Sequence, residues 1–160
     1  MPTVSEDHRC GVFAAKASVK LIMYFSTPAS YCKFYGLLGH LVMTMFVAMG
    51  DEEELVCSLL EDMIVLAGVE TAFFEAQIDL TFETMVRLAE NLGLREKTRQ
   101  LAVEFVVTLA EDRESGYGMM QMVPMEVFTR LLGTLIVMLG HIEEDPSWEK
   151  ATSDDKNEGE

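Results

Sequence analysis

The amino-acid sequence predicts an all-α protein: a HEAT-repeat α-solenoid fragment of antiparallel helix pairs, followed by an acidic C-terminal tail. Three observations predict this fold. Apolar residues recur at helical spacing through most of the 160 residues. Breakers and capping residues divide the chain into helices of ordinary length. A related segment returns 43 residues later, from Glu61 to Glu104, which lies within the period of about 40 to 47 residues of HEAT and armadillo arrays.

The first half of the chain is expected to form three helices. A Ser-Thr-Pro breaker follows the first of them, and a glycine follows each of the other two. The third helix begins after the N-cap residue Asp51 and carries three glutamates in its first turn, where acidic side chains are favourable. We expect these helices at Val12–Phe25, about Ser30–Met49 and Glu52–Ala67.

The second half is expected to form three more helices. Gly93 separates the first two, and a connector with Ser115, Gly116 and Gly118 precedes the third, which starts with a proline at a favourable first position. We expect them at Phe73–Asn91, Arg95–Glu111 and Pro124–Ile142.

Repeat structure sets the domain organisation. The segment EDMIVLAG from Glu61 matches EFVVTLAE from Glu104, and each helix pair of such an array buries its apolar face against neighbouring pairs. No partner helix is expected after the last apolar helix, so its outer side is an open surface. We divide the chain into an N-terminal segment (1–13) that is a candidate for disorder, HEAT-like repeats (14–142) and the acidic tail (143–160).

Composition excludes several classes of function. The formal net charge of −15 repels nucleic acid and anionic membranes and attracts basic proteins. No apolar stretch reaches the roughly 20 residues of a membrane span. Three cysteines without C-x-x-C spacing indicate reduced thiols, hence the cytoplasm and nucleus. No catalytic motif, phosphate loop or metal-ligand spacing occurs, so we expect no enzyme activity, no cofactor and no metal.

Three weaker signals each allow two interpretations. The methionines at 119, 120, 122 and 125 are typical either of ordinary packing or of an adaptable binding groove. The aromatic residues Phe34, Tyr35, Phe73 and Phe74 either pack in the core or help to line a pocket for Phe-Gly peptides. The acidic tail either stays solvated or binds a partner through Trp148 and the residues around it.

Three stretches carry a resemblance to a known family: TRQLAVEFVVTLAEDRE from Thr98, GMM from Gly118 and EEDPSWEK from Glu143. In order and spacing they closely resemble the importin beta-3 branch of the β-karyopherin (importin-β) family, especially its plant-type members. The upstream stretch LLEDMIVLAGVETAFF, from Leu59, is similar to the preceding repeat of that family. The chain corresponds to about three and a half HEAT repeats.

This resemblance implies nuclear import of protein cargo. Such receptors bind the localisation signals of basic cargo and Phe-Gly nucleoporins, and their N-terminal repeats bind Ran; those repeats have no counterpart here, so Ran association is not expected of this chain alone. The family's acidic loop matches Glu143, Glu144, Asp145 and Trp148, and the acidic character continues through Asp154 and Asp155. The resemblance therefore predicts a protein-binding module; the alternative is a truncated, non-transporting paralogue that acts as a helical scaffold or self-associates.

Overall fold

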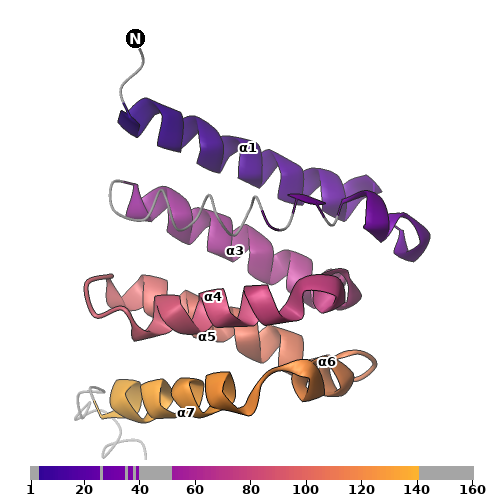
Figure 1. Cartoon of the computed structure of the whole chain (residues 1–160). Coiled ribbons are helices and arrows are strands. Elements are labelled where there is room, and N and C mark those ends of the chain that lie inside the picture. Colours follow the sequence, from indigo (N-terminus) through magenta and orange to yellow (C-terminus); the bar gives the residue numbers. More distant parts are fainter. Residues whose placement is uncertain (1–3, 26, 35, 38, 40–51, 141–160) are drawn as a thin grey trace, which may run out of the picture.

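A computed structural model describes residues 4–25, 27–34, 36–37, 39 and 52–140 (Figure 1). Every regular element in these ranges is a helix, and none is a strand. The all-α class expected from the apolar spacing is therefore confirmed. In chain order the elements are α1 (Val4–Phe25), the 3₁₀-helix η1 (Pro28–Lys33), α3 (Glu53–Val69), the 3₁₀-helix η2 (Thr71–Gln77), α4 (Ile78–Glu90), α5 (Glu96–Glu111), α6 (Gly116–Met122) and α7 (Met125–Leu139).

Most of the expected helices are present with shifted ends. Helices α3, α5 and α7 begin and end within three residues of the expected positions, because an apolar stripe and flanking breakers define them. Helix α1, however, begins at Val4, so most of the segment 1–13 is helical. Its first turns are polar, so they show no apolar periodicity from which a helix could be predicted. Glu6 and Asp7 lie in the first turn, where acidic side chains stabilise a helix.

Two other elements differ from the expectation. The expected helix Phe73–Asn91 starts as the 3₁₀-helix η2 and becomes α-helical only at Ile78. The expected helix Ser30–Met49 begins within the 3₁₀-helix η1 and then falls mostly outside the described residues.

The glycine-containing connector forms the short helix α6. The Asp112 carboxylate accepts hydrogen bonds from the backbone N–H groups of Glu114 (3.0 Å) and Ser115 (2.7 Å), and the bond from Ser115 contributes most to lowering the pKa of Asp112. A Cβ atom on Gly116 would lie 2.7 Å from the carbonyl oxygen of Leu109. Glycine is needed there because α6 packs closely against the end of α5, and not because the connector lacks structure.

The helices form two layers, and within each layer they run in the same direction (Figure 1). One layer contains α1, α3 and α5, in that order, and the other contains α4 and α7. Helix α4 packs antiparallel to α5 after the turn at residues 91–95, where Arg99 Nε donates a 2.8 Å hydrogen bond to the carbonyl of Ala89. Helix α7 then lies on α4, with the rings of Phe82 and Phe128 5.4 Å apart.

Most polar contacts within a layer join residues that lie a similar distance apart in the sequence. The hydrogen bonds between neighbouring helices of a layer connect residues 40 to 47 positions apart. The contacting pairs are Lys16–Ser58, Cys57–Thr98, Glu53–Arg95, Glu53–Thr98, Arg130–Glu90 and Arg130–Glu83. Neighbouring helices of each layer are thus joined by side chains that are distant in the sequence.

An aromatic cluster occupies the core between the layers. Phe74 lies edge-on to Phe73 at 5.3 Å and to Phe105 at 5.1 Å. All three side chains have 0% exposure, so η2 packs against α5 through closely packed aromatic rings. The surrounding core is mostly aliphatic and sulfur-containing: the fully buried side chains include Leu59, Leu60, Met63, Leu66 and Met85, together with the ring of Phe82.

Truncating the central ring tests this core. Phe105→Ala is expected to lower the free energy of unfolding by about 3–5 kcal/mol, because it removes a buried ring and leaves a cavity. Val107→Ala is the matched control on the same helix, since Val107 is 44% exposed, and it should change the free energy by no more than about 0.5 kcal/mol. Urea unfolding followed by circular dichroism measures both, and equal losses would contradict this description of the core.

Candidate protein-binding site

The acidic segment proposed from the sequence cannot be placed. Glu143, Glu144, Asp145, Trp148, Asp154 and Asp155 all lie outside the described residues. Their role in binding stays a prediction.

The aromatic residues named for a Phe-Gly pocket do not share a surface in the described part of the chain. Phe73 and Phe74 are completely buried, which fits the core-packing interpretation and leaves no ring surface for a peptide. Phe34 is partly buried and packs against the same core, while Tyr35 lies outside the described residues.

An acidic face on α3 and α5 is a better-defined candidate. Glu54 and Glu61 stand seven residues apart on α3, and Glu104 and Glu111 stand seven apart on α5, so each pair lies on one side of its helix. All four are exposed, and the two helices pack in parallel. We call these four glutamates the acidic face. Val65 and Val107 add exposed apolar surface on the same two helices.

The acidic face is only partly neutralised by the protein itself. Lys97 Nζ lies 2.9 Å from Glu61, and Arg95 Nη1 lies 3.5 Å from Glu54. Among the described residues no cation pairs with Glu104 or Glu111. Between the paired groups lies a polar hollow of about 320 Å³, lined by Glu54, Cys57, Ser58, Glu61, Arg95 and Lys97.

The sequence contained a signal for this face that was not used for function. Glu61 and Glu104 are the residues that the 43-residue offset matches, and in an array of stacked repeats equivalent residues lie on equivalent faces.

A partly buried carboxylate, Glu53, fixes α3 on α5 beside this face. Glu53 Oε1 accepts a 2.8 Å hydrogen bond from the backbone N–H of Arg95 and another from the hydroxyl of Thr98, whose oxygen lies 3.1 Å from Cys57 Sγ. Burial alone raises the pKa of Glu53, but the hydrogen bonds from Thr98 and Arg95 outweigh it, so the pKa is lowered from its ordinary value.

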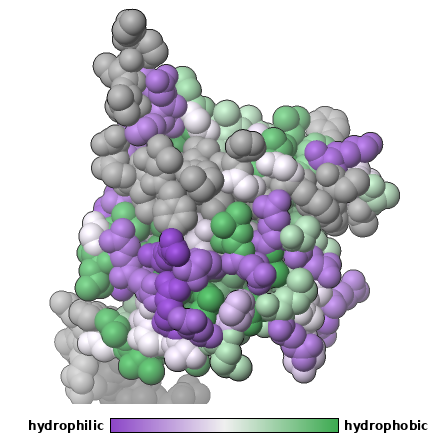
Figure 2. All heavy atoms as spheres, viewed as in Figure 1, coloured by the Kyte–Doolittle hydropathy of each residue, from purple (hydrophilic) through white to green (hydrophobic). Residues whose placement is uncertain are grey.

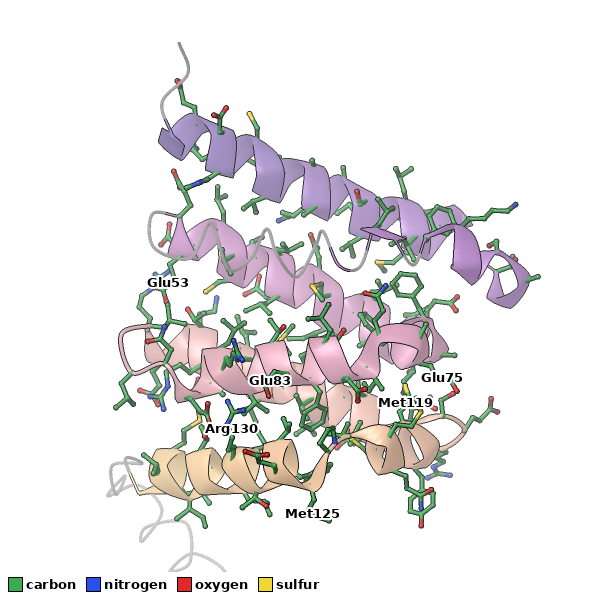
Figure 3. The ribbon with its side chains drawn as sticks, viewed as in Figure 1. Glu53, Glu75, Glu83, Met119, Met125 and Arg130 are labelled. Carbon is green, nitrogen blue, oxygen red and sulfur yellow. The ribbon has the colours of Figure 1, made fainter. Side chains whose placement is uncertain are left out.

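Arg130 fixes α7 on α4 in the same manner (Figure 3). Its guanidinium donates to both oxygens of Glu83 (2.8 and 3.0 Å) and to both oxygens of Glu90 (2.5 and 3.0 Å). The hydrogen bonds to Glu90 and then Glu83 raise the pKa of Arg130. Burial alone raises the pKa of Glu83. The hydrogen bonds from Arg130 and Arg87 outweigh this effect, so the pKa of Glu83 is lowered overall. Hydrophilic side chains gather on the face of the molecule that Figure 2 shows, around the position of α4.

The methionine cluster divides between core and surface. Met119 is 1% exposed, whereas Met122 and Met125 are 51% and 80% exposed. A groove of about 640 Å³ lies where α6 meets α7 and is lined by Tyr117, Met120, Gln121, Val123, Met125 and Phe128. Packing in the core is confirmed for Met119, whereas a binding role for the methionines that line the groove stays a prediction.

Within the described ranges, no group of three or more His, Cys, Asp or Glu side chains could hold a metal ion. No single described helix is long and apolar enough to cross a membrane, although α6 and α7 pass a test of length and composition when taken together despite the 107° bend between them. The absence of enzyme activity stays a prediction.

Comparison with known proteins adds no assignment. No protein-family model matches the chain. No curated protein matches it either.

The two carboxylates that join neighbouring helices predict how stability depends on pH. Because the pKa values of Glu53 and Glu83 are lowered in the folded protein, their contribution is fully present above the ordinary value of 4.5 and is lost as the pH falls below it. Replacing both by glutamine should lower the free energy of unfolding at pH 7 by about 1 kcal/mol per site.

The same double variant, Glu53→Gln with Glu83→Gln, should lose less stability than the natural protein between about pH 5 and pH 3. Chemical unfolding at several pH values measures this difference. If the free energy of unfolding changed with pH in the same way for both proteins, these carboxylates would make no pH-dependent contribution to stability.

Proposed function

We propose that this chain is a protein-binding module, a short HEAT-type solenoid that holds basic protein segments on the acidic face of α3 and α5. The observation that carries the proposal is the packing of helices within each layer through contacts that mostly join residues 40 to 47 apart. That spacing equals the repeat length of about 40 to 47 residues in HEAT and armadillo arrays, whose stacked helices provide extended binding surfaces.

Electrostatics supports a basic partner. The chain has a formal net charge of −15, and Glu104 and Glu111 are exposed carboxylates without a cation partner in the described ranges. A Lys- or Arg-rich segment would gain ion pairs along two parallel helices, with Val65 and Val107 contacting its aliphatic stems. The acidic tail supplies further carboxylates in this proposal.

The transport role rests on the resemblance to importin beta-3 receptors. It comprises nuclear import of basic cargo, association with Phe-Gly nucleoporins, and residence in the cytoplasm and nucleus. A Phe-Gly contact at Phe73 and Phe74 would require their rings to leave the core, so this proposal assigns no such role to them. Binding of basic cargo is the part that the described surface supports best.

Binding of a Lys/Arg-rich peptide, followed by fluorescence anisotropy, tests the proposal. Affinity should fall about tenfold or more between about 50 and 300 mM salt, because exposed charges are screened. In the same assay, Glu104→Lys with Glu111→Lys should weaken binding about tenfold, since both attractive carboxylates become repulsive. A Phe-Gly peptide in the same assay tests the nucleoporin contact. A chain that ends at Ile142 tests the contribution of the acidic tail.

The matched control is Glu75→Lys with Asp79→Lys. These two exposed residues lie on η2 and α4 (Figure 3 labels Glu75), and their replacement changes the net charge by the same amount. If the control weakened binding as much as the test variant, attraction would come from net charge alone and not from the acidic face. Binding that ignores salt would also refute the proposal.

A further inference from the structure

A hollow of about 300 Å³ lies at the end of the molecule where α7 ends, beside the turn that joins α4 to α5 (Figure 1). Its lining includes Glu90, Leu92, Arg99, Arg130, Gly133 and Val137. Leu92 and Val137 give it an apolar wall with exposed surface, and the two arginines give it positive charge. We call it the Arg99 hollow.

The guanidinium of Arg99 is held in place but has no anionic partner in the described part of the chain. Its Nε donates a hydrogen bond to the carbonyl of Ala89, which fixes the side chain between α5 and α4. Arg130, the other cation of the hollow, is already bound by Glu83 and Glu90. Since the terminal nitrogens of a guanidinium form a fork that matches a carboxylate, the Arg99 hollow fits a carboxylate group.

We propose that the first acidic residues of the tail, Glu143 and Glu144, bind Arg99 in this hollow, so that the tail is held against the helices of its own chain. The chain leaves α7 at Gly140, which is three residues, or about 5 Å of helix, beyond Val137 in the wall of the hollow. Glu143 follows Gly140 by three residues, which span at most about 11 Å. The tail therefore reaches Arg99 without any change in the helices.

Charge selects Arg99 among the possible sites for the tail. Residues 143–160 carry −6 of the net charge of −15, and the rest of the chain carries the other −9, so most of the surface repels the tail. Four basic side chains in the described ranges have no carboxylate partner: Lys20, Lys33, Arg99 and Arg113. The other three belong to the second half of α1, to η1 and to the turn before α6, at the opposite ends of the helices from the end of α7 (Figure 1).

This contact makes the tail less available to other molecules. Because the tail is attached to α7 beside the hollow, its effective concentration there is on the order of millimolar. A basic molecule at lower concentration reaches Glu143 and Glu144 only if its own cations bind them more strongly than Arg99 does. The contact is therefore autoinhibitory, and it does not depend on the proposed binding of basic segments to the acidic face.

Amide hydrogen exchange of residues 141–146 in the full chain, followed by mass spectrometry, tests the proposal. At about 50 mM salt, exchange should be about fivefold slower than in a free peptide of the same sequence, because a bound tail is protected. The protection should disappear near about 1 M salt, where the charges are screened. Exchange as fast as that of the free peptide at low salt would overturn the proposal.

Arg99→Glu is the decisive variant, and Arg113→Glu is its matched control, because each replaces an arginine without a carboxylate partner and changes the net charge equally. The first should abolish the protection, whereas the second should leave it unchanged. Combining Arg99→Glu with Glu143→Arg and Glu144→Arg should restore it, since the ion pair forms again with its signs exchanged. Equal loss in the two arginine variants would assign the protection to net charge alone and overturn the proposal.

A variant of the tail alone separates binding from folding, because Arg99 also bonds to Ala89 and its replacement weakens that contact. Glu143→Arg with Glu144→Arg leaves the described helices unchanged and should abolish the protection by itself. Thermal unfolding followed by circular dichroism checks that each variant is folded. Protection that survives this tail variant, or a folded charge-exchanged protein without protection, would overturn the proposal.

Discussion

The described helices bury their apolar surface against one another, and the rest of the structure follows from that constraint. Helix α3 lies between α1 and α5, and Leu59, Leu60 and Met63 are accordingly buried without exposed area. Among the described elements α7 packs mainly on α4, and Leu132, Ile136 and Leu139 stay exposed. Burial therefore depends on position in the stack.

Polar contacts fix the register of one helix against the next, which apolar packing alone does not define. Leucine and valine side chains tolerate a shift of one helix along another, but a carboxylate that accepts defined hydrogen bonds does not. Glu53 performs this role between α3 and α5, and Arg130 performs it between α7 and α4. Both contacts also leave the outer faces of their helices available, so the same interactions that assemble the stack orient its candidate binding surfaces.

The sequence allowed α3, α5 and α7 to be predicted, because each has an apolar stripe and clear end signals. It did not allow the start of α1 or the helix α6 to be predicted, because their helicity comes from polar turns and from a close packing contact at Gly116. The contacts of Glu53 and Arg130 depend on which side chains meet across 40 or more residues, and residue spacing alone does not fix that. The expected repeat matches Glu61 with Glu104, and the parallel packing of α3 and α5 shows which helices carry the acidic face.

The common direction of α1, α3 and α5 has an electrical consequence. Their backbone dipoles are aligned side by side, so the positive ends gather at one edge of the layer, where Glu6, Asp7, Glu53, Glu54 and Glu96 offset them. At the opposite edge no basic residue stands in the last turn of any of the three helices, and the negative ends are left uncompensated. A cationic group that reaches this edge is therefore stabilised by the carboxyl ends of three parallel helices.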